Sequence, residues 1–242
     1  MAAIKKTKRI EQLEFSDYVL QKRMTSGHGG PRKGAGAKRG KYGQGSYQRR
    51  TPFHKLTPAH VTLRVVKGLS GLRSSSLVKE VRKAFAAGCE RGDFRLVEYS
   101  IQHNHLHMIV EAESQDALSR GMKSIAARFA KAVNRVFKRT GKVIAGRYHV
   151  QFLTSPAQVR NALRYVLLNI RKHFKQQNGH APPVKIDEAS SGSQFDGWRA
   201  SSESLRVKIS IHEEVGVAKA ASWLLSKGWR RRGLINLSAI PG

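Results

Sequence analysis

The pattern of apolar and polar positions predicts four β-strands in the middle of the chain. Alternation of apolar with polar residues is typical of a half-buried strand, and short apolar stretches between turn residues are typical of a buried one. The four stretches lie around Val61–Val65, Phe94–Ile101, His105–Val110 and roughly Arg147–Leu153. In the third stretch the apolar residues Leu106, Met108 and Val110 fall on one face, which suits a core.

Three further stretches repeat apolar residues at helical spacing and predict amphipathic helices. The first follows the serines at 74–76, the second runs from about Ser114 to Arg139, and the third begins at Ser155-Pro156. Serine is a good N-cap, and proline is favoured at the first helical position. The apolar stripes are Leu77, Val81 and Phe85; then Leu118, Met122, Ile125, Phe129 and Val136; then Val159, Leu163, Val166 and Ile170. A polar stripe opposes the last of these, with Gln158, Asn161, Tyr165, Asn169 and Lys172.

The order of the first six elements predicts the fold. Strand, helix, strand, strand, helix, strand is the split βαβ pattern, so we expect an α+β, ferredoxin-like antiparallel sheet with one additional C-terminal helix. Residues 1–55 predict a disordered basic arm, because their Gly-rich, Lys/Arg-rich composition offers little to bury. We expect the domain proper over residues 56–175 and a tail over 176–242. The tail has one short helix near residues 213–226 and three anchoring tryptophans, Trp198, Trp223 and Trp229.

The charge of the chain points to a polyanionic partner. Its 242 residues carry 45 Lys and Arg against 16 Asp and Glu, a formal net charge of +29. Nucleic acid is the expected partner, with a membrane surface as second choice. No stretch of about 18 apolar residues predicts a membrane span. A single cysteine, Cys89, fits a reducing compartment, and we expect a cytoplasmic, nucleoid-associated protein.

The predicted 114–139 helix carries cations on its polar side, and a phosphate-facing role is as plausible as a solvated surface. Arg147, before the fourth strand, is another phosphate-contact candidate. The candidate DNA-binding residues are Arg120, Lys123, Arg128, Lys131 and Arg147.

Two histidines carry the first sign of chemistry. His105 and His107, in the run HNHLHMIVEAE, project from the same side of the predicted third strand, opposite its apolar face. Two neutral imidazoles on one face can hold a divalent metal. A partly buried, hydrogen-bonded structural pair is the alternative. Tyr165 and Asn169 lie four apart on one helix face, so one turn presents a nucleophile together with an oxygen ligand.

These stretches resemble a known family. HNHLHMIVEAE, the long basic helix, GRYHV at 146–150 and RYVLLNIRKH at 164–173 are similar to the IS200-like and REP-associated tyrosine transposases, the HUH single-tyrosine type. The resemblance implies that Tyr165 is the catalytic nucleophile. It implies that His105, His107 and Asn169 bind Mg²⁺ or Mn²⁺. One departure stands after the asparagine, where Ile170-Arg171 replaces the proline and small apolar residue of many relatives.

The resemblance also implies the reaction and the partner. The family cuts and rejoins single-stranded DNA beside a hairpin through a 5′-phosphotyrosine, acting as a monomer or a homodimer. Two residues compete for these roles: His103 as a metal ligand, and Tyr148 as the nucleophile. A non-catalytic nucleic-acid-binding module on the same fold is the second hypothesis, and a ribosome-associated basic protein is a weaker third.

Overall fold

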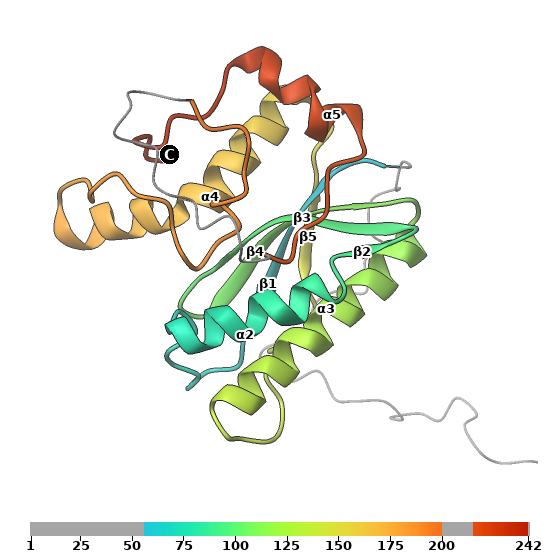
Figure 1. Ribbon diagram of the computed structural model, residues 1–242, viewed down its shortest axis with the longest axis vertical. Coiled ribbons are helices and arrows are strands. Elements are labelled where there is room, and N and C mark those ends of the chain that lie inside the picture. Colours follow the sequence, from blue (N-terminus) through green and yellow to red (C-terminus); the bar gives the residue numbers. More distant parts are fainter. Residues whose placement is uncertain (1–55, 200–214, 242) are drawn as a thin grey trace, which may run out of the picture. The chain divides into compact units, whose positions relative to one another are not determined.

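The computed structural model describes residues 56–199 and 215–241, and its elements follow the predicted order (Figure 1). The predicted basic arm lies outside the described residues. The bounds are β1 (Ala59–Arg64), α2 (Ser75–Ala86), β2 (Glu90–Arg91), β3 (Phe94–Ile101), β4 (His105–Ala112), α3 (Gln115–Val136), β5 (His149–Phe152), α4 (Pro156–Asn178), α5 (Trp223–Ser226) and the 3₁₀ helix η2 (Gly228–Arg232). The short strand β2 was not predicted.

The strands form one antiparallel sheet in the order β2-β3-β4-β1-β5. Apart from the two-residue β2, this is the order of a split βαβ sheet, so the predicted ferredoxin-like α+β fold is confirmed. The first strand, β1, lies in the interior of the sheet, between β4 and β5. Its register places Thr62 opposite His107 on one side and opposite His149 on the other.

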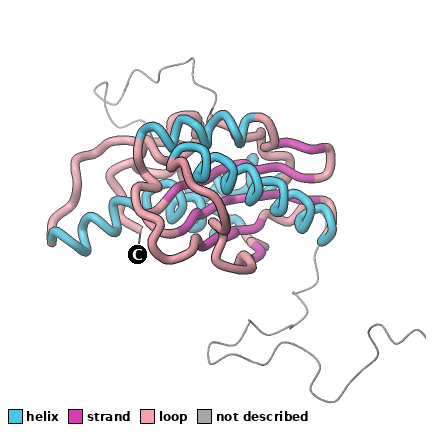
Figure 2. Tube along the Cα trace, turned by 90° about the horizontal axis from the view of Figure 1, so that it is seen from below, coloured by secondary structure: helices cyan, strands magenta, loops and turns pink. Residues whose placement is uncertain are grey.

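Helices cover both faces of the sheet. Helices α2 and α3 lie side by side on one face (Figures 1 and 2), whereas α4 packs on the other against β3 and β4. As predicted, Leu106, Met108 and Val110 of β4 join the core beneath α2 and α3. Ile109 points the opposite way, into the smaller core beneath α4. The side chains that alternate with the main core therefore face α4.

Most of the described tail has no regular structure, which corrects the predicted helix near residues 213–226. Residues 215–222 are not helical, and α5 spans only Trp223–Ser226. Hydrogen bonds just before α5 explain this difference. The buried Glu111 of β4 accepts hydrogen bonds from the backbone N–H groups of Ala221 (2.7 Å) and Ser222 (2.9 Å), which holds this stretch extended before the turn begins.

The three tryptophans behave differently from one another. Trp229 is fully buried against α4, and Trp198 is half-buried in the same apolar cluster. Trp223, by contrast, is 49% exposed, so the prediction that it anchors the tail is wrong. Its indole instead lies beneath the Arg231 guanidinium, 5.2 Å from the ring centroid.

The tail also covers the outer edge of β3. Ile101 donates its N–H to the Ala189 carbonyl (2.8 Å), and Ser191 donates its N–H to the Tyr99 carbonyl (3.0 Å). These bonds satisfy edge groups that would otherwise invite pairing with another chain. The Ser191 hydroxyl donates to the buried carboxyl group of Glu98. Burial raises the pKa of Glu98 to about 8, although the hydrogen bond from Ser191 opposes the shift.

Replacing Glu98 should change how stability depends on pH. Between the unfolded pKa of 4.5 and the folded pKa of about 8, the folded state holds a proton that the unfolded state lacks. The stability contribution is therefore complete below 4.5 and is lost as the pH rises toward 8, by about 1.4 kcal/mol per pH unit. Glu98→Gln should remove this slope, as measured by denaturant unfolding at several pH values. Exposed Glu113→Gln is the control, and equal slopes in wild type and Glu98→Gln would contradict the assignment.

Candidate active site

Two neighbouring strands present four polar side chains toward α4. His60 and Thr62 come from β1, and His105 and His107 come from β4. Alternation puts each pair on one face of its strand. Because Thr62 and His107 are directly opposite in the register, the two pairs meet across the β1–β4 ladder. The sheet thus assembles a cluster in which three of the four side chains are histidines.

The imidazoles of His105 and His107 face each other through their Nε2 atoms, 2.8 Å apart. The other nitrogen of His105, Nδ1, donates to the Asn104 amide oxygen at 2.6 Å. That bond fixes the tautomer, since an amide oxygen can only accept, and it leaves the Nε2 lone pair of His105 directed at His107. The histidine pair predicted from the sequence is therefore a converging pair.

Two residues of β1 hold His107 from its other side. The Nδ1 atom of His107 lies 3.1 Å from His60 Nε2 and 3.2 Å from the Thr62 hydroxyl oxygen. A hydroxyl can donate or accept, so Thr62 can serve either tautomer of His107. Nδ1 contacts of this kind orient the ring when Nε2 binds a metal.

Tyr165 lies on α4 directly over this cluster. Its ring centroid is 5.0 Å from that of His107 and 5.8 Å from that of His60, in edge-to-face contacts. The helix begins as predicted, because the Ser155 hydroxyl accepts from the Gln158 N–H at 3.3 Å and Pro156 opens its first turn. A cavity of about 540 Å³ adjoins the tyrosine. It is lined by Tyr165, His60 and His107 together with Thr62, His149, Gln151, Asn161 and Arg164.

Asn169, one turn beyond Tyr165, is buried rather than part of an exposed polar stripe, being only 1% exposed. The sequence placed Asn169 on the polar stripe of this helix and did not predict its burial. Its amide Nδ2 donates to His173 Nε2 at 3.3 Å, while its Oδ1 has no hydrogen-bond partner among the described residues. A buried amide oxygen without a partner is costly in a folded protein, so this atom is available to a ligand.

The electrostatics keep the histidines neutral. Burial is the first cause in each case. Burial together with the neighbouring histidines lowers the pKa of His107 to about 3, and burial with nearby charged groups lowers the pKa values of His105 and His60 to about 4. His173 contributes to the shifts of both His105 and His107, so the Asn169–His173 pair lies within their electrostatic reach. Neutral imidazoles are the form that binds a metal.

These groups fit a small divalent cation. Two ligands about 2.1 Å from an octahedral ion and at right angles lie about 3.0 Å apart, close to the 2.8 Å between the two Nε2 atoms. Within residues 56–199 and 215–241, no group of three or more His, Cys, Asp or Glu side chains could hold a metal. The Oδ1 atom of Asn169, which is buried and has no partner among the described residues, is a suitable oxygen donor beside the two imidazoles.

The two competing residues occupy other places. His103 is exposed in the bend before β4, outside the strand that aligns His105 with His107. Tyr148 is half-buried against the main core. The geometry therefore favours His105, His107 and Tyr165 over these alternatives.

The predicted basic residues of α3 are not brought to this cluster. Arg120, Lys123, Arg128 and Lys131 lie on the helix layer on the opposite face of the sheet from α4. Arg120 forms an exposed ion pair with Asp93 at 2.5 Å. Arg147 is exposed in the segment before β5. Closer to the tyrosine are two other cations, Arg164, which lines the cavity, and Lys172, whose Nζ lies 5.8 Å from the Tyr165 ring centroid.

Sequence reasoning missed His60, Thr62 and His173. His60 and Thr62 are the polar members of the alternation that predicted β1, and this signal could have placed them on the face opposite the core. Their meeting with His107, which is 47 residues from His60 and 45 from Thr62, depends on strand register. His173 lies four residues after Asn169 on α4, which is the spacing of a helix-face pair.

Residues 57–169 match the model of the family described as "Transposase IS200 like". Comparison with curated proteins gave no match. Among solved structures, a REP-associated tyrosine transposase bound to a REP hairpin is 18% identical, covering 53% of this chain and 74% of its own, with a TM-score of 0.44. A bacterial tRNA(His) guanylyltransferase-like protein in complex with GTP is 14% identical over 56% and 74%, with a TM-score of 0.38. A protein of Deinococcus radiodurans described as a transposase is 16% identical over 57% and 100%, with a TM-score of 0.32.

No helix within the described residues has the length and apolar character needed to cross a membrane.

Replacing His60 should weaken metal binding through His107. His60→Ala removes an Nδ1 partner of His107, and lost partners of this kind typically lower metal affinity about 10- to 100-fold. His60→Gln keeps a polar side chain there and should retain most of the affinity. Titration calorimetry with Mn²⁺ measures the metal affinity of both variants. The control is His180→Ala, which removes an exposed histidine distant in sequence from His60 and should keep the wild-type affinity. Equal affinities for His60→Ala and wild type would show that His60 does not position His107.

Proposed function

We propose that this chain, whose residues 57–169 match the IS200-like transposase family, cuts and rejoins single-stranded DNA through Tyr165. The observation that carries the proposal is the edge-to-face contact of Tyr165 with His107, 5.0 Å between centroids, beside a cavity that both residues line. A nucleophile, a converging pair of neutral imidazoles and an amide oxygen without a partner can together support metal-assisted phosphoryl transfer to a tyrosine.

The tyrosine performs the covalent step. The Tyr165 hydroxyl gives up its proton, and its oxygen attacks the scissile phosphorus to form the new P–O bond. The bond between phosphorus and the 3′-oxygen breaks, and the departing 3′-oxygen takes up a proton to become a free 3′-hydroxyl. The product is a 5′-phosphotyrosine. Because the phosphodiester energy is kept in this link, a second 3′-hydroxyl can attack it, join the strands and restore the tyrosine.

The surrounding residues position the reacting groups. His105, His107 and Asn169 would hold a Mg²⁺ or Mn²⁺ ion, which when bound supplies a positive charge to offset the charge that develops on the phosphate. His60 and Thr62 orient His107, and Asn104 orients His105. Arg164 and Lys172 add positive charge beside the tyrosine, where a phosphate would enter.

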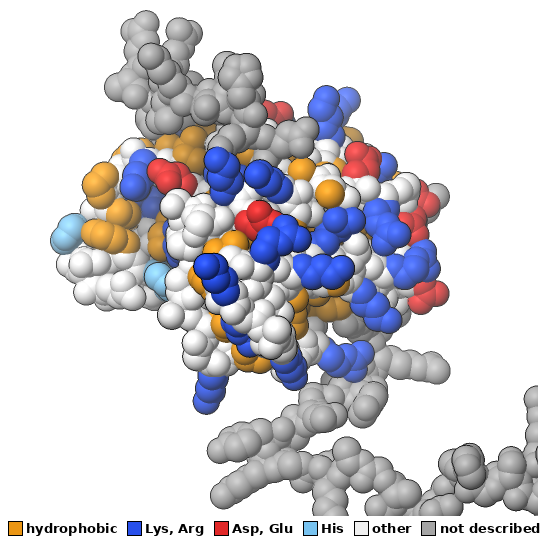
Figure 3. All heavy atoms as spheres, turned by 60° about the horizontal axis from the view of Figure 1, so that its bottom comes forward, with side chains coloured by type: hydrophobic (Ala, Val, Ile, Leu, Met, Phe, Trp, Pro, Cys, Tyr) orange, Lys and Arg blue, Asp and Glu red, His pale blue; other side chains and the backbone are white. Residues whose placement is uncertain are grey.

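We propose a DNA hairpin beside the cleaved strand as the partner of the wider basic surface. Lys and Arg side chains spread over the α2 and α3 face, with few acidic ones among them (Figure 3). Phosphate contacts of this kind position nucleic acid without specifying sequence. The candidates are Arg120, Lys123, Arg128 and Lys131 on α3, with Arg147 before β5. The chain acts as a monomer or a homodimer.

A binding module without catalysis is the second candidate. The charge of the chain favours it equally, because +29 attracts any nucleic acid. The buried, unpartnered Oδ1 of Asn169 favours the enzyme, since a pure binder has no evident use for it.

Removing the Tyr165 hydroxyl should abolish the covalent product. Tyr165→Phe keeps the ring contacts with His60 and His107 but has no nucleophile. Wild type incubated with labelled single-stranded DNA carrying a hairpin and Mn²⁺ should give a protein–DNA adduct on denaturing gels, and Tyr165→Phe should give none. Tyr148→Phe is the matched control and should form the adduct. An adduct that persists in Tyr165→Phe and disappears in Tyr148→Phe would transfer the role to Tyr148.

Chelation separates the two candidate functions. EDTA should reduce cleavage by at least about 100-fold, as expected when charge stabilisation in the transition state is lost, while binding of the same oligonucleotide stays unchanged. The measurement pairs a cleavage gel with fluorescence anisotropy. Tight binding with no cleavage in Mg²⁺ or Mn²⁺, across hairpins of varied sequence, would favour the non-catalytic module.

A further inference from the structure

A second, larger groove lies on the opposite side of α4 from Tyr165. Its volume is about 1040 Å³, and it shares no lining residue with the cavity at the tyrosine. Its walls come from the beginning of α2, the C-terminal half of α4 and the segment 182–193. Tyr165 and Phe174, which lines the groove, are nine residues apart on α4, about 14 Å along the axis. The groove is therefore close to the candidate active site without being part of it.

The charge of the groove suits a polyanion. Five cationic side chains line it, Arg73, Lys79, Arg82, Arg171 and Lys185, against two carboxylates, Asp187 and Glu188. Arg73 and Asp187 form an ion pair with contacts of 2.6 and 3.2 Å, so their charges offset each other and leave four cationic side chains against Glu188. Lys79 and Lys185 are exposed on opposite walls, one on α2 and one on the tail segment.

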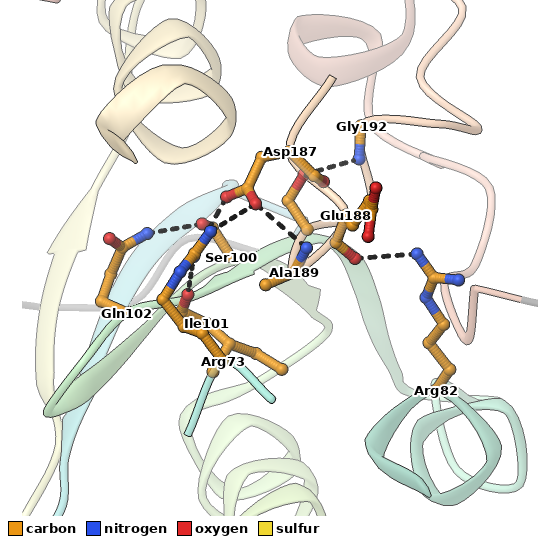
Figure 4. A network of polar contacts seen from close by, with 10 residues as sticks. Arg73, Arg82, Ser100, Ile101, Gln102, Asp187, Glu188, Ala189 and Gly192 are labelled. Carbon is orange, nitrogen blue, oxygen red and sulfur yellow. Dashed lines mark hydrogen bonds and ion pairs between the residues drawn. The ribbon is translucent and has the colours of Figure 1, made fainter. Parts of the chain in front are cut away.

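The walls of the groove are built from interlocked polar contacts (Figure 4). Arg73 also donates to the Ile101 carbonyl at the end of β3, and Asp187 accepts from the Ala189 N–H at 3.0 Å. Arg82 of α2 donates to the Glu188 carbonyl at 2.8 Å. These bonds tie the 182–193 segment both to the sheet edge and to α2, so the separation of Lys79 from Lys185 is held by the fold.

The floor of the groove offers surface for nucleobases. Phe174 and Ile170 of α4 line it with Pro182 and Pro183. Aromatic rings beside cations are the usual platform for single strands, because every base has a π face while the phosphates take the charges. Duplex DNA keeps its bases stacked on each other and gains nothing from such a platform.

The two sites are joined by α4 itself. Asn169 and His173 face the histidine cluster, and the residues that follow each of them, Ile170 and Phe174, line the groove. The histidine cluster and the groove are therefore separated by neighbouring residues of one helix.

We propose that this groove binds the unpaired stretch of the substrate strand next to the scissile phosphate, with Lys79 and Lys185 on phosphates and Phe174 stacked on a base. The inference rests on the proposed function for the identity of the ligand. It adds a binding site for single-stranded DNA, separate from both the reacting residues and the basic face of α3.

The test measures binding alone. In the full-length chain carrying Tyr165→Phe, without divalent metal, anisotropy of a labelled oligothymidine of about 20 nucleotides reports affinity across a salt series. The double variant Lys79→Gln/Lys185→Gln should bind about tenfold more weakly at 0.1 M salt. Its slope of log affinity against log salt should be less steep by about 1.4, since each phosphate contact on a single strand contributes about 0.7. Phe174→Leu should weaken binding about fivefold with an unchanged slope, because stacking releases no counterions.

A matched control distinguishes binding in the groove from non-specific attraction of DNA to the basic chain. The control, Lys142→Gln/Lys219→Gln, removes two exposed charges outside the groove and should keep the wild-type slope. Thermal melting confirms that each variant folds. Equal losses in the control and groove variants would overturn the proposal, as would an equal loss for a hairpin-free duplex. Because no cleavage is involved, failure of Tyr165 as nucleophile leaves this result standing, and absence of groove binding leaves the cleavage result standing.

Discussion

The antiparallel pairing of β1 with β4 is the constraint on which the candidate site depends. It sets Thr62 opposite His107 and brings His60 within 3.1 Å of the same ring. The β-strand period of two then sends these side chains toward α4, while Leu106, Met108 and Val110 fill the core on the other face. A shift of one residue in this register would exchange the two sets, burying the imidazoles in the main core and directing apolar residues at Tyr165. Stability and chemistry therefore require the same register.

The position of α4 is the second requirement, and the tail provides it. Arg160 donates to the Gly233 and Leu234 carbonyls at 2.8 and 3.2 Å. The buried Arg171 donates to the Pro182, Pro183 and Ser238 carbonyls, and burial lowers the pKa of its guanidinium. Trp229 packs in the apolar cluster formed by α4 and the tail. This accounts for the departure at Ile170-Arg171: α4 does not end after Asn169 but continues to Asn178, and the arginine holds the tail against the helix that carries Tyr165.

The sequence predicted what local patterns encode. The bounds of β3, the start of α4 at Ser155-Pro156 and the two faces of β4 follow from alternation, capping and helical spacing, and the structure agrees. It could not predict the burial of Asn169, because that burial depends on how α4 packs on β3 and β4, which no local pattern encodes. His60 was missed because its partner is distant in sequence. The α3 cations were predicted correctly as a basic face, yet which face of the sheet they occupy follows only from the packing of α3 opposite α4.

The most direct test of the account is the location of the metal. Anomalous diffraction from crystals of the full-length protein soaked in Mn²⁺ should show one strong peak within ligand distance, about 2.1–2.3 Å, of His105 Nε2, His107 Nε2 and Asn169 Oδ1. Binding there would show that strand register and the seating of α4 together build a metal-binding active site beside Tyr165. A peak at His103, or no peak at the converging Nε2 atoms at saturating Mn²⁺, would contradict it.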